Sequence, residues 1–413
     1  MLQYYEPRLN LAAPDELNIM GIVVSLQEPV DGELLRGVVE ELRVRFPYFY
    51  IRAAYRGDDP VTVPNELPMT VRNSWEPIRL NSEESNFHLA AWKYEGRRLA
   101  FEIPHDLTDG AGLFPYVKSA VFLYLSRATG RTFDPAGFRL PGEEIPESET
   151  GDPFRNLDIK AVKAPFYQKK PIPDVFHLAG GEAPDKRVFY LKLPEEQVMR
   201  YCREQDASPN VLFSVFLAKA ARRYDPDNEK PVTAFVAVDH KAILGNHDNY
   251  RLFAGNNLLV FPKSMDLNDI SRTCTMARGQ LILQAQPENS LWYLKTVKTR
   301  FEKMKTLPLE EKMDWVAKEA ALPRFTATVS YTKSRGFEQL NAYIEELYSL
   351  ADPGVTDVVC ELQCFKHRFY LSFLQSFEDQ RLFRTFTQEL SELEIPYEVK
   401  RREQLKLNSI SWE

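Results

Sequence analysis

One aperiodic, proline-rich stretch divides this chain and constrains its fold more than any other feature. Between residues 131 and 186 the sequence places eight prolines, at positions 135, 141, 146, 153, 165, 171, 173 and 184. Proline interrupts both helices and central strands, so this segment predicts a crossover draped on the surface. At 413 residues the chain also exceeds the size at which single hydrophobic cores stop growing. We therefore expect two lobes, residues 1–165 and 187–413, joined by a crossover at 166–186.

Strand and helix patterns occur on both sides of this crossover. The N-terminal half predicts strands over 17–26, 48–55, 86–94 and 98–103, and helices over 32–45 and 112–128. The C-terminal half predicts strands over 187–193, 232–238, 257–262, 325–332, 355–363 and 368–377. Its predicted helices are 194–204, one opening at 208–209, 267–283, 290–305, 309–318 and 380–393. The fold class is therefore α/β or α+β, with a similar plan in both halves.

Composition and charge exclude several classes of function. The net charge is −7, and no basic block is interleaved with aromatic residues, so nucleic acid is not an expected partner. The N-terminus lacks the pattern of a secretory signal, and the longest apolar runs are too short to span a bilayer. We expect a cytoplasmic protein. Cys360 and Cys364 share one face of a strand and are interpreted as free core thiols, because a zinc pair would need further His or Cys neighbours.

The residues that carry chemistry gather in the segment 103–110. His105, Asp109 and Gly110 are spaced His-x-x-x-Asp-Gly, between an alternating apolar segment and an amphipathic helix. An imidazole in such a loop can act as a general base near neutral pH, although a hydrogen-bonded loop histidine would look the same. Asp109 can be a second catalytic acid, a metal ligand or a structural residue, and one His with one Asp is a thin metal site. Gly110 supplies the backbone freedom of a sharp loop exit.

Residues 104–112 resemble the active-site signature of the acyltransferase superfamily that includes chloramphenicol acetyltransferase, condensation domains of peptide synthetases, plant BAHD enzymes and microbial alcohol acetyltransferases. Three more segments are similar to that superfamily: residues 34–55, 208–212 and 253–257. Pro104 stands where condensation domains carry a first histidine, so the chain most resembles the alcohol acetyltransferase-like members. The Asp-Phe-Gly-x-Gly motif is not found, and residues 330–337 occupy its place without matching it.

This resemblance implies two chloramphenicol acetyltransferase-like lobes, each a mixed sheet with flanking helices, and an active-site tunnel between them. It implies that His105 is the general base, that Asp109 pairs with an arginine and fixes the loop, and that Gly110 allows close backbone approach. Acyl-coenzyme A would be a substrate, the acceptor a small hydroxyl or amine, and no resident cofactor or metal is expected. A carrier protein supplying the acyl group in trans and a non-catalytic scaffold are the alternatives. Two lobes in one chain favour a monomer.

Further candidates lie in the C-terminal half. Strand alternation puts the hydroxyls of Thr326, Thr328 and Ser330 on one face, and we take Ser330 and Thr328 as candidate oxyanion donors or as ordinary strand residues. The other candidates are polar or basic and are weaker. They are Asn256 and Asn257, interpreted as turn-forming; His240 next to Asp239, and His247, in a segment that shapes the acceptor site or is a loop; and Lys263, Lys333 and Arg335, which can meet a coenzyme A phosphate or be surface charges.

Overall fold

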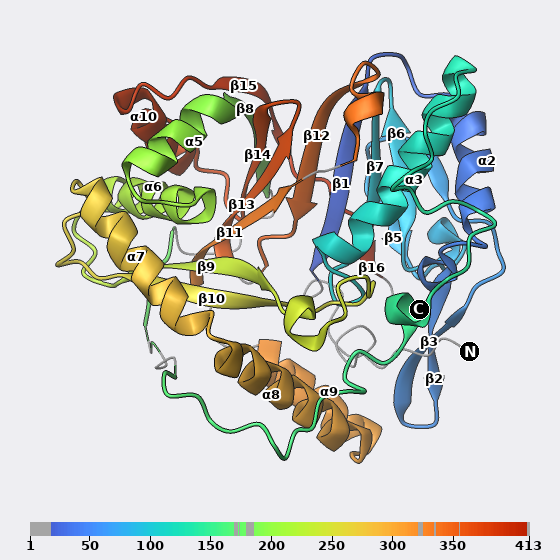
Figure 1. The fold of residues 1–413 in the computed structure, drawn as a ribbon, viewed down its shortest axis with the longest axis horizontal. Coiled ribbons are helices and arrows are strands. Elements are labelled where there is room, and N and C mark those ends of the chain that lie inside the picture. Colours follow the sequence, from blue (N-terminus) through green and yellow to red (C-terminus); the bar gives the residue numbers. More distant parts are fainter. Residues whose placement is uncertain are drawn as a thin grey trace.

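Two mixed sheets lie side by side, each with helices packed on it (Figure 1). The computed structural model describes residues 18–168, 172, 174–178, 186–320, 325–333, 336–354 and 356–410. The strand order is β12-β1-β7-β6-β4 in the first sheet and β10-β9-β11-β13-β14-β8-β15 in the second. Both sheets combine parallel with antiparallel pairs, which confirms the predicted mixed α/β class with two lobes. We call them the first and the second lobe after these sheets.

The first lobe contains the predicted strands and helices, and several short elements that the patterns do not predict. Its sheet strands are β1 (Ile19–Leu26), β4 (Val71–Asn73), β6 (Ala91–Glu95) and β7 (Arg98–Pro104), and its helices are α2 (Gly32–Leu42) and α3 (Gly110–Thr129). The small elements are η2 (Pro47–Phe49), β2 (Ile51–Arg56), β3 (Asp59–Pro64), β5 (Arg79–Leu80) and η3 (Glu83–Ser85). The predicted hairpin is confirmed, since β6 pairs antiparallel with β7 and delivers the chain to His105. Gly130, with φ of 65°, ends α3 in the left-handed conformation.

The second lobe packs helices against a seven-stranded sheet. Its strands are β8 (Arg187–Pro194), β9 (Val232–Asp239), β10 (Ala254–Phe261), β11 (Phe325–Lys333), β13 (Thr356–Phe365), β14 (Arg368–Gln375) and β15 (Glu398–Gln404). Its helical segments are α5 (Glu195–Glu204), α6 (Pro209–Tyr224), η4 (Lys241–Leu244), α7 (Ile270–Gln284), α8 (Pro287–Lys305), α9 (Leu309–Ala320), η5 (Glu338–Leu340) and α10 (Arg381–Glu392). Ser208 caps α6, as its Ser-Pro start predicts.

The second core holds three of the four cysteines. Cys202, Cys274 and Cys360 are buried in it, and Cys364 packs against it half-buried. All four thiols are free, which confirms the interpretation of Cys360 and Cys364 as core thiols. None of the described helices is both long enough and apolar enough to cross a membrane.

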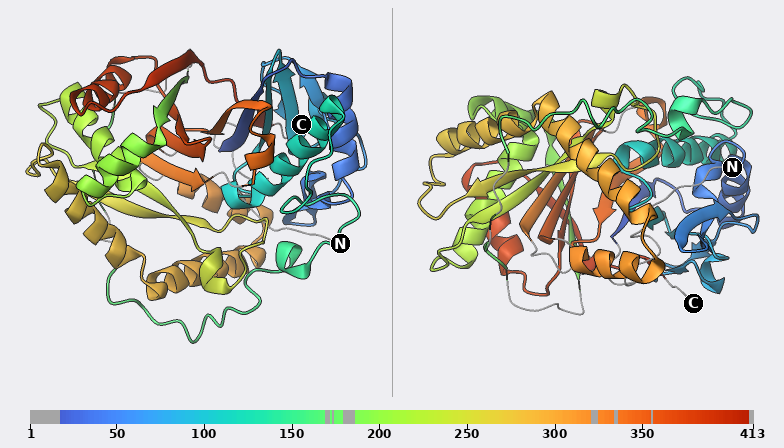
Figure 2. Two further views of the ribbon diagram at one scale, coloured as in Figure 1. Left: turned by 45° about the horizontal axis from the view of Figure 1, so that its top comes forward. Right: turned by 90° about the horizontal axis from the view of Figure 1, so that it is seen from below.

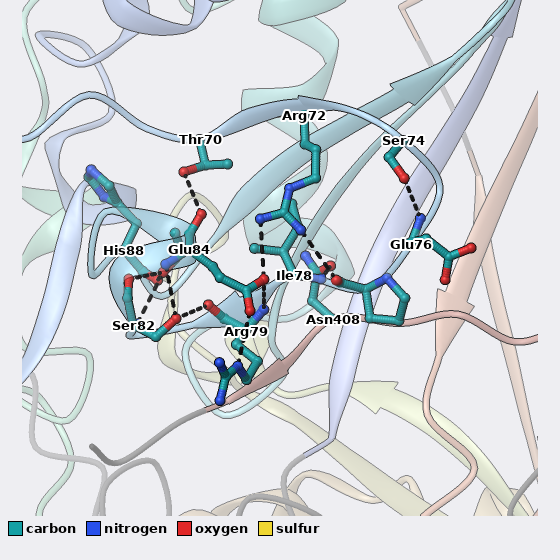
Figure 3. Close-up of polar contacts among 12 residues, drawn as sticks. Thr70, Arg72, Ser74, Glu76, Ile78, Arg79, Ser82, Glu84, His88 and Asn408 are labelled. Carbon is teal, nitrogen blue, oxygen red and sulfur yellow. Dashed lines mark hydrogen bonds and ion pairs between the residues drawn. The ribbon is translucent and has the colours of Figure 1, made fainter.

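Late segments of the chain return to the first lobe. β12 (Ile344–Ala351) pairs antiparallel with β1 along its whole length, and β16 (Ser409–Ile410) pairs with β5. Figure 3 shows Asn408 beside Ile78, whose backbone N–H donates to the Asn408 Oδ1 at 2.9 Å. The lobe boundaries at 165 and 187 stay a prediction, and the sheet order adds that strands beyond residue 187 complete the first sheet.

The two lobes also share one hydrophobic cluster. The face of the second sheet that is turned away from its own helices contributes apolar side chains, among them Tyr190, Val359 and Tyr370, to the core of the first lobe. Tyr190 and Tyr348 of β12 pack edge to face at 4.7 Å. Burial of these rings fixes the sheets relative to each other, and with them the loops at their facing ends.

The proline-rich segment runs outside both sheets, beneath α8 in Figure 1. Its one described helix is α4 (Glu147–Thr150). Backbone carbonyls of Phe154 and Val162 accept hydrogen bonds from Lys298 and Lys295 of α8, at 3.1 and 2.9 Å. The described part of the segment therefore lies along the surface of the second lobe, as its composition predicts.

Two glutamines of α7 cover the edge strand β10. Gln284 bonds both the N–H and the C=O of Leu258, each at 2.8 Å. Gln280 does the same for Val260, at 2.9 and 3.1 Å. In both views of Figure 2, α7 (gold) lies beside this edge of the sheet. The two primary amides therefore take the positions that a neighbouring strand would occupy.

Candidate active site

His105 follows the last residue of β7, in the loop that leads into α3. Its backbone N–H donates to the Asn18 carbonyl at 2.7 Å, and Leu107 closes a tight turn onto the Pro104 carbonyl. The imidazole Nδ1 lies 2.9 Å from the Thr108 carbonyl oxygen. A carbonyl only accepts, so Nδ1 carries a proton, and in the neutral imidazole the free lone pair is then on Nε2. The residue is half-buried.

Asp109 is the N-cap of α3, and each of its oxygens has a partner. Oδ1 accepts from Gly112 N at 2.9 Å and from Lys241 Nζ at 2.5 Å, while Oδ2 accepts from Phe253 N at 2.9 Å. The resemblance implies an arginine here, and the structure places a lysine, because η4 starts with Lys241, 1% exposed, directly opposite the carboxylate. Three donors and full burial make Asp109 a structural anchor between the lobes. No three His, Cys, Asp or Glu side chains of the described chain gather as metal ligands.

Close backbone approach occurs at Gly112 and not at Gly110, which corrects the expectation from the motif. A Cβ at Gly112 would lie 2.0 Å from the Tyr250 carbonyl oxygen. A Cβ at Gly110 would have ordinary contact, 3.7 Å from the Thr332 Oγ1. Gly110 begins α3 and faces the second sheet, so it lines the gap between loop and sheet without being sterically obligatory.

The segment from Asp239 to Phe253 belongs to the second lobe and contacts the loop that carries His105. We call this segment the clasp. The Thr108 hydroxyl donates to the Tyr250 carbonyl at 2.6 Å, and the Tyr250 ring stacks on Tyr48 at 4.1 Å. The Asp239 carboxylate accepts from Lys241 N at 2.8 Å, which orients the lysine toward Asp109. This segment was predicted as a loop or an acceptor site, and it positions the histidine loop.

His240 and His247 do not join the loop. The His240 ring packs against Tyr293, with centroids 4.8 Å apart, and His247 is exposed. Asn256 and Asn257 are wrongly predicted as turn-forming: both lie inside β10, where the ladder pairs Asn257 with Val236. They line a cavity of about 300 Å³ beside Trp292 and Tyr293.

The basic candidates for a coenzyme A phosphate have mixed outcomes. Lys263 is paired with Glu229 at 3.8 Å and also contacts the Pro226 carbonyl. The Lys333 side chain and Arg335 lie outside the described residues.

The predicted hydroxyl face of β11 lies opposite the histidine loop. Ala327 and Val329 point into the core of the second lobe, so Thr328, Ser330 and Thr332 point away from it. The Thr328 hydroxyl donates to the Thr356 Oγ1 at 3.3 Å. Thr326, 1% exposed, donates to the Phe176 carbonyl at 2.6 Å and is structural. Ser330 is half-buried and lies one pleat repeat from Thr332, whose Oγ1 would be 3.7 Å from a Cβ at Gly110.

Glu361 of β13 connects this face to His105. The parallel ladder places Glu361 directly opposite Ser330, and its carboxylate accepts a hydrogen bond from the Ser330 hydroxyl. Burial raises the pKa of Glu361 to about 7, against the Ser330 hydrogen bond and the His105 charge, which both lower it. His105, Ser330 and Glu361 therefore form one cluster between the lobes.

Sequence reasoning missed Glu361, Lys241, Gly112 and Tyr250. Only Glu361 left a signal, because it is a carboxylate in the middle of the apolar strand 356–365. A charge that a buried strand tolerates there indicates a polar partner. The others are recognised only once the lobes are placed together.

The sequence matches no protein-family model and no curated protein. Solved structures are similar over nearly the whole chain. TRI101 of F. sporotrichioides, solved with coenzyme A and T-2, has a TM-score of 0.60 at 12% identity, covering 96% of this chain and 99% of that one. Polyketide synthase associated protein 5 of Mycobacterium tuberculosis has 0.58 at 13%, covering 95% and 97%.

The first condensation domain of the CDA synthetase is similar with a TM-score of 0.57 at 13% identity, covering 94% of this chain and 93% of that one. At these identities the likeness concerns the fold. It agrees with the resemblance seen in the motifs and with the two mixed sheets. The chain thus has the two-lobed fold that condensation domains share with TRI101.

Proposed function

We propose that the chain is an acyltransferase that moves an acyl group from acyl-coenzyme A to a hydroxyl or amine acceptor, with His105 as general base. The observation that carries this proposal is the bond from Nδ1 to the Thr108 carbonyl, because it fixes the tautomer in which Nε2 is the proton acceptor. The half-buried ring at the facing ends of two sheets suits a reaction between two substrates. A tunnel that admits them from opposite sides is part of the proposal.

The reaction follows from one base and one hydrogen-bond donor. Nε2 of His105 takes the proton of the acceptor as its oxygen or nitrogen bonds to the thioester carbonyl carbon. The carbonyl π electrons move to oxygen, and the Ser330 hydroxyl donates to the resulting oxyanion. The C–S bond then breaks, and the thiolate takes the proton from the imidazolium. Free thiol and ester or amide leave, and His105 is neutral again.

The solved structures support this choice of donor. TRI101 is described with coenzyme A, and the starter condensation domain of rhizomide synthetase with C8-CoA. The same fold in condensation domains supports the alternative donor, an acyl group on a carrier protein acting in trans. Comparing acyl-coenzyme A with acyl-carrier protein at equal concentration decides between the two donors.

His105→Ala tests the base. We expect kcat for thiol release, with a panel of acyl-coenzyme A donors, alcohols and amines, to fall about 100- to 10,000-fold. The exposed His247→Ala is the matched control and should keep the wild-type rate. Equal rates for His105→Ala and wild type would exclude this mechanism. No thiol release by the wild type with either donor would favour a binding scaffold.

A further inference from the structure

Glu361 and Ser330 share a single hydroxyl proton. A serine hydroxyl has one hydrogen to donate, and in this structure it is directed at the Glu361 carboxylate. While Glu361 is ionised, that proton is engaged, and Ser330 offers lone pairs to its other neighbours. When Glu361 is protonated, its own O–H can donate to the Ser330 oxygen. The serine proton is then free for a third atom.

We propose that the carboxyl group of Glu361 decides whether Ser330 can serve as the oxyanion donor, so that only the enzyme with a neutral Glu361 stabilises the tetrahedral intermediate. Glu361 is thus a positioning residue that acts through Ser330. The proposal rests on the acyl transfer proposed above. No bond to substrate is made by Glu361, and no proton is consumed, since the carboxyl, hydroxyl and oxyanion form one chain of hydrogen bonds.

The strands and the loop around Glu361 determine which groups can interact with its carboxyl. β11 presents Ser330 at the paired position, β14 presents Ser372 on the other side, and the histidine loop presents His105. The titratable groups of the described chain that interact with the carboxyl are His105 and the Cys360 thiol, which points into the opposite core. A carboxyl flanked by two hydroxyls and an imidazole can change its protonation without breaking a structural ion pair.

The direction of the pH effect follows from the raised pKa. A carboxyl group that titrates at about 7 is largely neutral below this pH and ionised above it. Transfer should therefore slow as the pH rises past neutrality. At pH 9 about 1% of such a group is protonated, so we expect kcat/KM to fall roughly 50-fold between pH 7 and pH 9.

The test is the pH profile of Glu361→Gln. The glutamine amide donates to the Ser330 oxygen at every pH and imitates the neutral carboxyl. We expect its kcat/KM to change less than about threefold between pH 7 and pH 9. Glu398→Gln, an exposed strand position in β15, is the matched control and should keep the wild-type profile.

Ser330→Ala provides a second, independent profile. We expect a loss of about 100-fold or more at pH 7 and no further alkaline fall, because the controlled donor is gone. Thr328→Ala, two residues earlier on the same face, should cost less than Ser330→Ala. An alkaline fall that persists unchanged in both Glu361→Gln and Ser330→Ala would overturn the proposal while leaving His105 as base. Full activity of His105→Ala would overturn it together with the proposed function.

Thermal unfolding reads out the titration without substrate. Burial of a neutral Glu361 stabilises the wild type below the ordinary pKa of a glutamate, and this contribution is lost as the pH rises through about 7. Glu361→Gln should therefore gain a few degrees in Tm over the wild type at pH 8.5 and little at pH 4.5. A Tm difference that does not change with pH would contradict the role of ionisation.

Discussion

The orientation of His105 depends on a chain of single hydrogen bonds. Its Nδ1 is held by the Thr108 carbonyl at 2.9 Å, and the Thr108 hydroxyl is in turn bonded to the Tyr250 carbonyl at 2.6 Å. The first of these groups belongs to the first lobe and the last to the second. The direction of the Nε2 lone pair is therefore set by contacts between lobes and not by the loop alone.

Gly112→Ala tests whether the orientation of His105 depends on contacts between the lobes. The new Cβ would lie 2.0 Å from the Tyr250 carbonyl, so the clasp must move, and we expect a loss of about 1 to 3 kcal/mol in unfolding free energy together with a lower kcat. Gly110→Ala is the matched control, since its Cβ has ordinary contact at 3.7 Å. Denaturant unfolding and initial rates measure both, and equal effects of the two variants would contradict the argument.

At the scale of single elements, the sequence predicts what depends on neighbours along the chain. The helix from Gly110, the hairpin that delivers His105 and the hydroxyl face of β11 follow from local periodicity. β12 does not, because Ile344, Leu347, Tyr348 and Ala351 recur at helical spacing although the segment pairs as a strand with β1. Its register is decided by the partner strand, which local periodicity does not contain.

The contact between Asp109 and the clasp also depends on residues far apart in the chain. Lys241 could not be recognised from the sequence, because nothing local connects residues 132 positions apart. Sequence analysis missed Glu361 for a related reason, because its partner Ser330 becomes a neighbour only through the parallel register of β11 with β13. Residue types and local order are therefore predictable here, whereas pairings between distant strands and between the lobes are not.

Lys241→Met tests the ion pair that joins the clasp to Asp109. Removing the ammonium leaves the buried Asp109 carboxylate without its counter-charge, and we expect a loss of about 3 to 5 kcal/mol in unfolding free energy. Lys241→Arg should retain most of the stability, because it keeps the charge. Lys263→Met, a partly exposed lysine of the same lobe, should change the free energy by less than about 0.5 kcal/mol. Urea titrations of the three variants decide.

On the scale of the whole molecule, the two lobes are completed by each other. The second half of the chain supplies β12 to the first sheet, and the segment after β15 returns to bind Ile78 and Glu102 through Asn408. Glu102 in turn holds Lys93, and both side chains are fully buried. The lobes should therefore unfold together and not as independent domains.

Asn408→Ala tests that coupling. It leaves the Ile78 N–H without its acceptor, at an expected cost of about 1 to 3 kcal/mol. Circular dichroism and tryptophan fluorescence should still report one coincident midpoint, lowered in the variant. The exposed Asn268→Ala is the control and should not shift the midpoint. Two separate transitions would show that the returning segment does not join the lobes.

The glutamine pair on α7 has a consequence for assembly. Exposed sheet edges are templates on which a further chain can be laid, and this one is already occupied at Leu258 and Val260 by side-chain amides. The opposite border, β15, carries two acidic and three basic residues among its seven, and such charges disfavour pairing with a flat, apolar strand. Fibre-like growth by strand addition is thus discouraged at both borders of the larger sheet.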